Sequence, residues 1–108
     1  MSGNQRTKVR REPGPRRHYL LRLFVVGLGP NSKQALSNLQ SLCREYLPGR
    51  CTIEVVDVVK NFQAAVRDNI LITPALVLVA PLPRVVVLGN LSDPRKLRFA
   101  LRLPEGGA

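Results

Sequence analysis

One nearly continuous apolar run constrains the fold of this chain more than any other feature. Residues 19–26 read Tyr-Leu-Leu-Arg-Leu-Phe-Val-Val, and the turn sequence Gly-Leu-Gly-Pro at 27–30 ends the run. A run of this length, rich in β-branched and aromatic residues, is typical of a strand that is buried on both faces. We therefore expect covering elements on both sides of the strand.

The segments that follow predict a strand–helix–strand unit. Apolar residues spaced by one, three and four predict a helix from Asn31 to Leu47, with Asn31 or Ser32 as its N-cap. The helix should end at Pro48-Gly49, and residues 52–58 form a second β-branched strand. Two strands joined by one helix form a βαβ unit with a right-handed crossover.

The rest of the chain completes a small α/β domain. Its expected elements are a short helix from Lys60-Asn61 that carries Phe62, Ala65 and Val66, strands at 75–80 and 84–88 that form an antiparallel hairpin, and a helix from Pro94 capped by Ser92 or Asp93. The order β-α-β-α-β-β-α predicts a thioredoxin-like fold, with a mixed four-stranded sheet and helices on both faces. Pro74 supports this fold, because a proline before the third strand is typically cis there.

Charge divides the chain into parts. Lys and Arg number 17 against 7 Asp and Glu, which gives a net charge of +10. Residues 1–17 hold six of the basic residues and only Glu12, so we expect a flexible basic arm at 1–17, a folded domain at 18–103 and a short tail at 104–108. The arm suits an acidic partner, either nucleic acid or protein, and equally a purely solubilising role.

The sequence lacks the motifs of an enzyme. Cys43 and Cys51 form no C-x-x-C, so the sequence has neither a zinc signature nor a dithiol redox motif. Cys43 lies on the apolar stripe of the first helix, where we expect a buried, inert thiol, and a regulatory disulfide with Cys51 would require a Cβ geometry that the sequence does not give. Ser32 has no local base, and His18 is the only histidine. Gly27-Leu28-Gly29 lacks the third glycine of a dinucleotide loop. We expect a cytoplasmic, non-enzymatic protein with no cofactor and no membrane span.

Many short motifs, evenly spaced over residues 19–103, together resemble the KaiB family of circadian clock proteins. They are Leu23-Phe24-Val25-Val26-Gly27, Pro30-Asn31-Ser32, Ala35-Leu36, Val55-Val56-Asp57-Val58, Lys60-Asn61, Asp68, Ile70-Leu71, Thr73-Pro74, Leu76, Pro81, Pro83 and Gly89-Asn90-Leu91-Ser92-Asp93. The resemblance implies an adaptor that binds the N-terminal ATPase ring of a KaiC-type hexamer by strand-edge and helix contacts, with a further signalling protein as a second partner. Lys60 and Asn61 would contribute to this contact, although a helix-start role fits them equally well.

The family is metamorphic, and the resemblance therefore implies an alternative, often tetrameric fold of the C-terminal half. The segment 97–103 has apolar residues at a strand period, while Leu97, Ala100 and Leu101 also form a helical stripe. Clock-type members typically have Gly and Asp where this chain has Ala100 and Arg102, and both changes favour helix. We therefore predict that the thioredoxin-like form dominates.

Other features separate this chain from clock-type members and keep alternatives open. We assign conformational control to Pro74, Gly89, Ala100 and Arg102, although Pro74 could equally be a structural turn proline. Val85-Val86 stands where family members commonly have a basic pair in the fourth strand, so we expect a divergent member of the family. Its expected state is a monomer, a dimer or a tetramer. The alternatives are a thioredoxin-like sensory or scaffold module for another partner, such as a histidine kinase, and a nucleic-acid-binding protein that uses its basic arm. Nucleic acid is less expected, because the aromatic residues are scattered.

Overall fold

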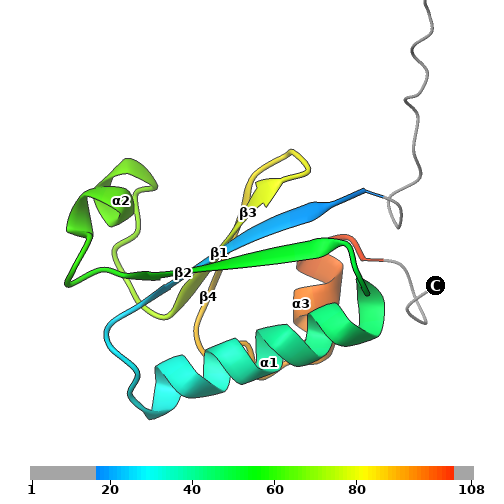
Figure 1. Cartoon of the computed structure of the whole chain (residues 1–108), viewed down its shortest axis with the longest axis horizontal. Coiled ribbons are helices and arrows are strands. Elements are labelled where there is room, and N and C mark those ends of the chain that lie inside the picture. Colours follow the sequence, from blue (N-terminus) through cyan, green and yellow to red (C-terminus); the bar gives the residue numbers. More distant parts are fainter. Residues whose placement is uncertain (1–16, 104–108) are drawn as a thin grey trace, which may run out of the picture.

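A computed structural model describes residues 17–103 and contains three helices and four strands in that range (Figure 1). The elements are β1 (Tyr19–Val25), α1 (Pro30–Tyr46), β2 (Cys51–Asp57), α2 (Phe62–Arg67), β3 (Ala75–Ala80), β4 (Val85–Leu88) and α3 (Pro94–Ala100). Each element begins and ends close to its expected position. The predicted basic arm, apart from Arg17, and the predicted tail at 104–108 lie outside the described residues.

The strands form one mixed sheet in the order β2-β1-β3-β4. β1 pairs parallel with β2 and antiparallel with β3, and β4 completes a hairpin with β3. α1 and α3 cover one face of the sheet, and α2 lies on the opposite face (Figure 1). The predicted thioredoxin-like arrangement, with helices on both faces, is confirmed.

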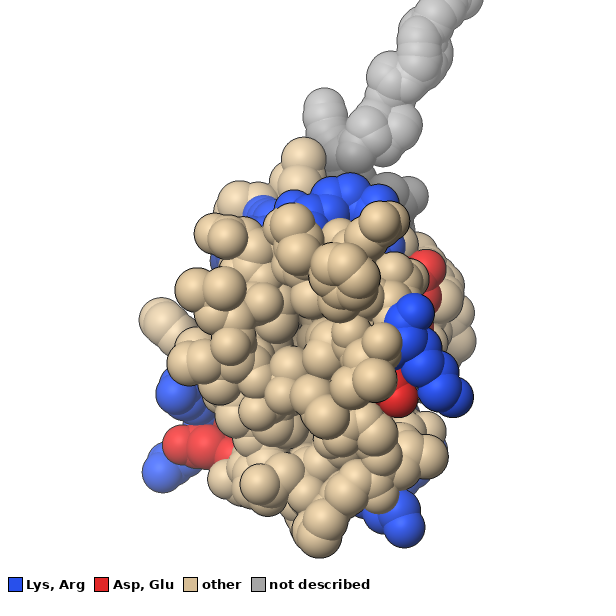
Figure 2. Space-filling view, turned by 90° about the vertical axis from the view of Figure 1, so that its left-hand side faces the viewer, with Lys and Arg blue, Asp and Glu red and all other residues tan. Residues whose placement is uncertain are grey.

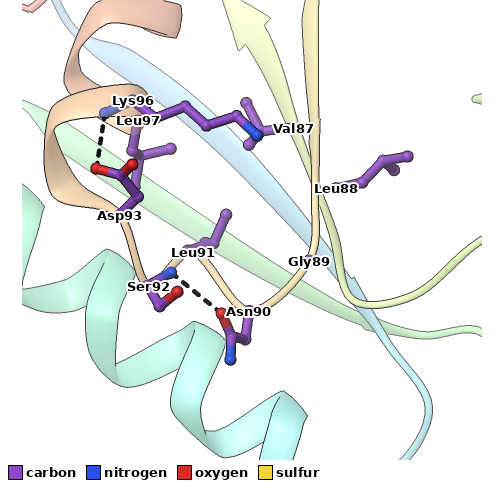
Figure 3. Close-up of a pocket in the computed structure, with 9 residues that line it drawn as sticks. All are labelled: Val87, Leu88, Gly89, Asn90, Leu91, Ser92, Asp93, Lys96 and Leu97. Atoms are coloured by element: carbon purple, nitrogen blue, oxygen red, sulfur yellow. Dashed lines mark hydrogen bonds between the residues drawn. The ribbon is translucent and has the colours of Figure 1, made fainter.

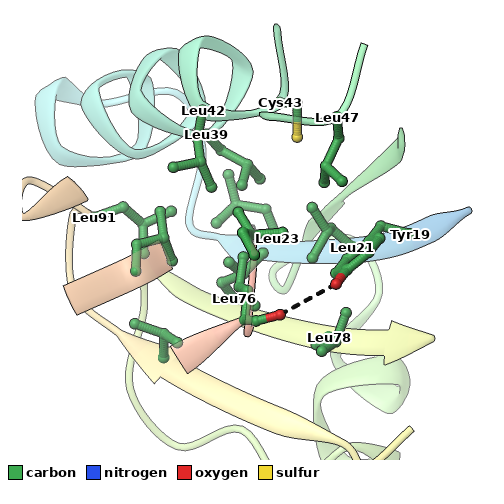
Figure 4. Close-up of a cluster of buried hydrophobic side chains, with 14 of the residues drawn as sticks. Tyr19, Leu21, Leu23, Leu39, Leu42, Cys43, Leu47, Leu76, Leu78 and Leu91 are labelled. Carbon is green, nitrogen blue, oxygen red and sulfur yellow. Dashed lines mark hydrogen bonds between the residues drawn. The ribbon is translucent and has the colours of Figure 1, made fainter. Parts of the chain in front are cut away.

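The larger core lies between the sheet and the helices α1 and α3. Leu21 and Leu23 of β1 are fully buried there, and they pack with leucines of both helices (Figure 4). The hydroxyl of Tyr19 donates a hydrogen bond of 3.3 Å to the carbonyl oxygen of Leu101, which joins the first strand to the end of the last helix. Burial of the Tyr19 side chain raises its pKa above the usual value.

A second, smaller core lies under α2. Phe24 is fully buried at its centre, and Ala64 and Ala65 are the buried residues of α2 that pack there. The sequence placed Phe62, Ala65 and Val66 on this helix without saying which of them faces the core, and Phe62 and Val66 are the two large apolar side chains among them. Both are exposed, because a helix of six residues buries only one narrow face, and the two small alanines occupy it.

The first helix begins earlier than its predicted cap. Neither Asn31 nor Ser32 is the N-cap: Gly29 takes that position with extended backbone, and Pro30 occupies the first turn. Proline suits this position because its fixed φ matches the helix and its missing N–H has no partner to lose. Ser32 is buried in the second helical position after Pro30.

The last helix is capped as predicted, by Asp93 rather than Ser92. The Oδ1 atom of Asp93 accepts a hydrogen bond of 3.1 Å from the backbone N–H of Arg95 and one of 3.2 Å from that of Lys96. Figure 3 shows the bond from Lys96. The preceding loop is tied to α1, because the side-chain amide of Asn38 donates to the carbonyl oxygen of Asn90 at 2.9 Å. These bonds fix the direction in which the chain enters α3.

Candidate docking surface

The two predicted contact residues lie in the loop between β2 and α2. The side chain of Lys60 is exposed, and its backbone N–H donates to the carbonyl oxygen of Asp57 at 3.1 Å. Asn61 is the N-cap of α2, with its side-chain oxygen accepting from the N–H of Ala64 at 3.3 Å. Asn61 therefore has a structural role as a helix cap. Lys60 exposes its aliphatic side chain and its charged amino group to solvent beside α2.

Apolar side chains surround this loop and remain exposed to solvent. One shallow groove at the ends of β1 and β2 is lined by residues from the β1–α1 loop, the β2–α2 loop, α2 and the segment before β3: Val26, Val58, Phe62, Ala65, Val66, Ile70, Leu71 and Thr73. The exposed fractions are 63% for Phe62, 70% for Val66 and 90% for Leu71. A soluble domain seldom exposes so many large apolar side chains in one place without a partner.

A second groove continues the first toward the edge strand β4. The two grooves share Ile70 and Leu71, and the second extends past Ile72 to Val86 and Leu88. Its polar lining residues are Asp68, Asn69 and Arg84. Figure 2 shows the side of the molecule that carries α2 and the β1–α1 loop, where charged side chains lie at the margins and the centre is uncharged. We call the surface formed by these two grooves the apolar face. Its chemistry fits an apolar patch on another protein better than a polyanion.

One arginine holds α2 and the apolar face in place. The guanidinium of Arg22, on β1, contacts Glu54 of β2 at 2.8 Å and Asp68, directly after α2, at 3.1 Å. These hydrogen bonds, above all the one to Glu54, raise the pKa of Arg22 above its usual value. Arg22 thus links the central strand, an edge strand and the end of α2.

Two of the four residues expected to control conformation are joined by a hydrogen bond. The N–H of Gly89, after β4, donates to the carbonyl oxygen of Pro74, before β3, at 2.9 Å. The Thr73–Pro74 peptide bond is cis, as predicted, and Gly89 has a φ of +101°, which L side chains rarely adopt. The pair closes the open end of the β3–β4 hairpin next to the apolar face.

The other two residues form the C-terminal end of α3. Ala100 is the last helical residue, and Arg102 follows with left-handed backbone at a φ of +55°. The N–H of Arg102 donates to the carbonyl oxygen of Phe99, and the N–H of Leu103 donates to that of Arg98. This bonding pattern is a Schellman motif, in which Arg102 occupies the position that usually holds glycine.

We expect Arg102→Gly to stabilise the described fold by about 0.5–1 kcal/mol, because glycine adopts left-handed backbone without steric cost. Urea denaturation followed by circular dichroism measures the change. Arg95→Gly is the matched control: Arg95 is an exposed residue inside α3, so its replacement should destabilise the protein by a similar amount. Equal destabilisation by both variants would contradict the capping role of Arg102.

The structure separates the residues of the one catalytic pair that the sequence offered. His18 lies before β1, where its Nε2 is 2.7 Å from the Oγ1 of Thr52, whereas Ser32 lies at the start of α1, beyond the other end of β1. Within residues 17–103, no cluster of three or more His, Cys, Asp and Glu side chains is suited to hold a metal ion. In the same range, no helix is both long enough and apolar enough to cross a bilayer.

Sequence reasoning missed the apolar face and the role of Arg22. The sequence does not identify the exposed residues of the face, because the spacing of Phe62 and Val66 fits a buried helix stripe as well as an exposed one. Arg22 interrupts an otherwise apolar strand, and this interruption is the only sequence signal for the ion pairs that it forms.

Comparison with known proteins connects this geometry to a family. The sequence model of the KaiB domain matches residues 22–103. The circadian clock oscillator protein KaiB of Synechococcus elongatus is 42% identical over 92 residues, which cover 85% of this chain and 90% of that protein. KaiB of Prochlorococcus marinus is 39% identical over 89 residues, which cover 82% of this chain and 76% of that protein.

Solved structures agree with the fold. The N-terminal domain of SasA from Synechococcus elongatus is similar with a TM-score of 0.66 and 28% identity, over 83% of this chain and 89% of that domain. Deadhead, a thioredoxin of Drosophila melanogaster, has a TM-score of 0.63 and 20% identity, over 82% of each chain, and shows the fold alone. With the KaiB domain model matched from the first strand to the end of the last helix, the chain belongs to the KaiB family.

Proposed function

We propose that this protein is a non-enzymatic adaptor that binds the ATPase ring of a KaiC-type hexamer and modulates clock signalling or timing and stress signalling. The family match over residues 22–103 is the observation that carries the proposal. The relatives are named circadian clock oscillator proteins, and one similar solved structure is the N-terminal domain of SasA. A further signalling protein is a second proposed partner.

The apolar face is the proposed contact surface. It has several large apolar side chains, among them Phe62 and Leu71, that the isolated chain leaves exposed. Burying exposed aromatic and aliphatic residues in a partner's pocket is the usual source of most binding energy at an interface. Lys60 lies beside this face, where its positive charge would attract an acidic group on the partner, while Asn61 caps the helix that carries Phe62.

The proposal is tested by mixing the full chain with the KaiC-type ATPase of its own source in the presence of ATP. Size-exclusion chromatography with light scattering should show the chain eluting with the hexamer. We expect Phe62→Gln to weaken binding at least about 30-fold, the loss expected when a residue contributing about 2 kcal/mol is removed. Titration by fluorescence anisotropy measures the change in the dissociation constant.

Phe99→Gln is the matched control for this experiment. Phe99 is also an exposed phenylalanine on a short helix, but α3 lies on the opposite face of the sheet from α2. We expect its dissociation constant to stay within about twofold of the wild-type value. Equal loss in both variants, or none in Phe62→Gln, would move the contact away from the apolar face; absence of binding by the wild-type protein would overturn the proposed partner.

Conformational control by Pro74, Gly89, Ala100 and Arg102 is part of the same proposal. Pro74 and Gly89 are hydrogen-bonded at the open end of the hairpin, and Ala100 and Arg102 form the end of α3, so all four lie in the C-terminal half that an alternative fold would rearrange. Alanine at 100 favours the helical form relative to glycine by about 1 kcal/mol. Arg102 opposes that form by its left-handed backbone, contrary to the helix-favouring role that the sequence suggested.

A further inference from the structure

The fold brings the two cysteines together at the end of the molecule away from α2. Cys43 lies in the last turns of α1, and Cys51 is the first residue of β2. Their Sγ atoms are 2.7 Å apart. A disulfide bond is about 2.05 Å long, so the two sulfurs need to approach by less than about 1 Å to form one.

The backbone between the two cysteines is fixed by hydrogen bonds. The N–H of Leu47 donates to the carbonyl oxygen of Cys43 at 2.8 Å, and the N–H of Arg50 donates to that of Leu47 at 3.0 Å. The carbonyl oxygen of Arg50 in turn accepts from the N–H of Tyr19 on the central strand at 2.8 Å. The thiols are therefore held close by the turn itself, and their proximity does not depend on a flexible loop.

The two thiols differ in their surroundings. Cys43 is 8% exposed and belongs to the larger core (Figure 4), whereas Cys51 is half-buried on an edge strand. A hydrogen bond from the Cys43 thiol lowers the pKa of Cys51, and the same bond, together with burial, raises the pKa of Cys43. Cys51 is thus the more accessible of the two sulfurs, and Cys43 is the buried partner behind it.

We propose that Cys43 and Cys51 form an oxidisable thiol pair that reacts with hydroperoxides to give an intramolecular disulfide. The Cys51 thiolate attacks a peroxide oxygen, the O–O bond breaks, and Cys51 becomes a sulfenic acid while the leaving hydroxide takes up a proton as water. The Cys43 sulfur then attacks the Cys51 sulfur, the S–S bond forms, and the S–O bond breaks with release of a second water. Two thiols lose two electrons, and one hydrogen peroxide is reduced to two waters.

This site is separate from the apolar face and from any catalytic thiol position of a thioredoxin. The position at the start of α1, where a thioredoxin would carry its nucleophile, holds Gly29-Pro30-Asn31-Ser32 in this chain. The cysteine pair instead joins the C-terminal end of α1 to the first residue of β2, so its oxidation links the helix to the edge strand covalently. The disulfide should raise the midpoint of urea denaturation, since it closes a short loop in the unfolded chain.

The test uses the reduced full-length protein with equimolar hydrogen peroxide and requires no ATPase ring. We expect both free thiols to disappear, the intact mass to fall by two hydrogen atoms, the protein to stay a monomer on a non-reducing gel, and dithiothreitol to reverse all three changes. In the untreated wild-type protein, iodoacetamide should label Cys51 at least about tenfold faster than Cys43. Persistence of both thiols, or oxidation only to intermolecular dimers, would overturn the proposal.

Two single variants assign the roles of the two sulfurs. Cys43→Ser removes the second thiol, so the sulfenic acid at Cys51 should accumulate and be trapped by dimedone. Cys51→Ser leaves only the buried thiol, and we expect no dimedone adduct under the same conditions. Equal trapping in both variants would refute Cys51 as the attacking thiolate, and the labelling rates in the wild-type protein provide the same comparison without any mutation.

Discussion

Replacing Phe24 with alanine is expected to lower the free energy of unfolding by about 3–5 kcal/mol. Phe24 is fully buried on the α2 side of the sheet, and the other buried residues of the smaller core are small: Ala64, Ala65, Ala75 and Val77. None of these neighbours is large enough to refill the space of a phenyl ring, so a cavity remains. Urea denaturation followed by circular dichroism measures the loss.

Phe24→Leu is the control that separates the cost of a cavity from the cost of any substitution at this position of the strand. Leucine retains much of the apolar volume, so we expect it to cost about 1–1.5 kcal/mol. Because Phe24 is the large side chain beneath α2, the alanine variant should also loosen α2 and thereby weaken any binding to the proposed ring partner. A loss below about 1 kcal/mol for Phe24→Ala would show that this core collapses around the smaller residue.

Leu101→Ala should have the second largest effect, about 2–5 kcal/mol. Leu101 is fully buried in the larger core at the C-cap of α3, and its carbonyl oxygen accepts the hydrogen bond from Tyr19. Truncation removes the apolar contacts that the Leu101 side chain makes within the larger core and leaves a cavity there. Thermal and urea denaturation both measure this change in stability.

Phe99→Ala is the control for Leu101→Ala within the same helix. Phe99 is 86% exposed, so its truncation should change stability by less than about 0.5 kcal/mol. In a strand with period two, residues 99 and 101 would share one face and respond alike. Similar losses in both variants would therefore indicate that the strand form of this segment is populated.

Most of the fold follows from the sequence because its strands and helices have clear periods. The buried strand at 19–26 fixes the centre of the sheet, and Pro94 behind Asp93 gives the start of α3. The segment 97–103 fits both a strand and a helix by period alone. Burial of Leu97, Leu101 and Leu103 against the sheet selects the helix here, with Phe99 left outside.

The candidate sites are harder to predict, because they depend on contacts between distant segments. The rotation of α2, which turns Phe62 and Val66 outward, is set by the tertiary contacts of two alanines. A disulfide between the two cysteines stayed an open alternative, since eight residues of separation in the sequence give no distance between the sulfurs. Ser32 and Asn31 have good capping side chains, but the proline before them starts the helix first.

Few interactions hold α2 against the sheet, and we therefore expect this helix to open locally. A six-residue helix is far too short to persist alone, and this one is held by two buried alanines, by its Asn61 cap and by the ion pair after its end. Its amide protons should therefore exchange with solvent through local opening, well before those of the central strand β1. A partner that recognises the closed helix binds only that fraction of molecules, so every substitution that closes α2 more firmly also tightens the apparent affinity.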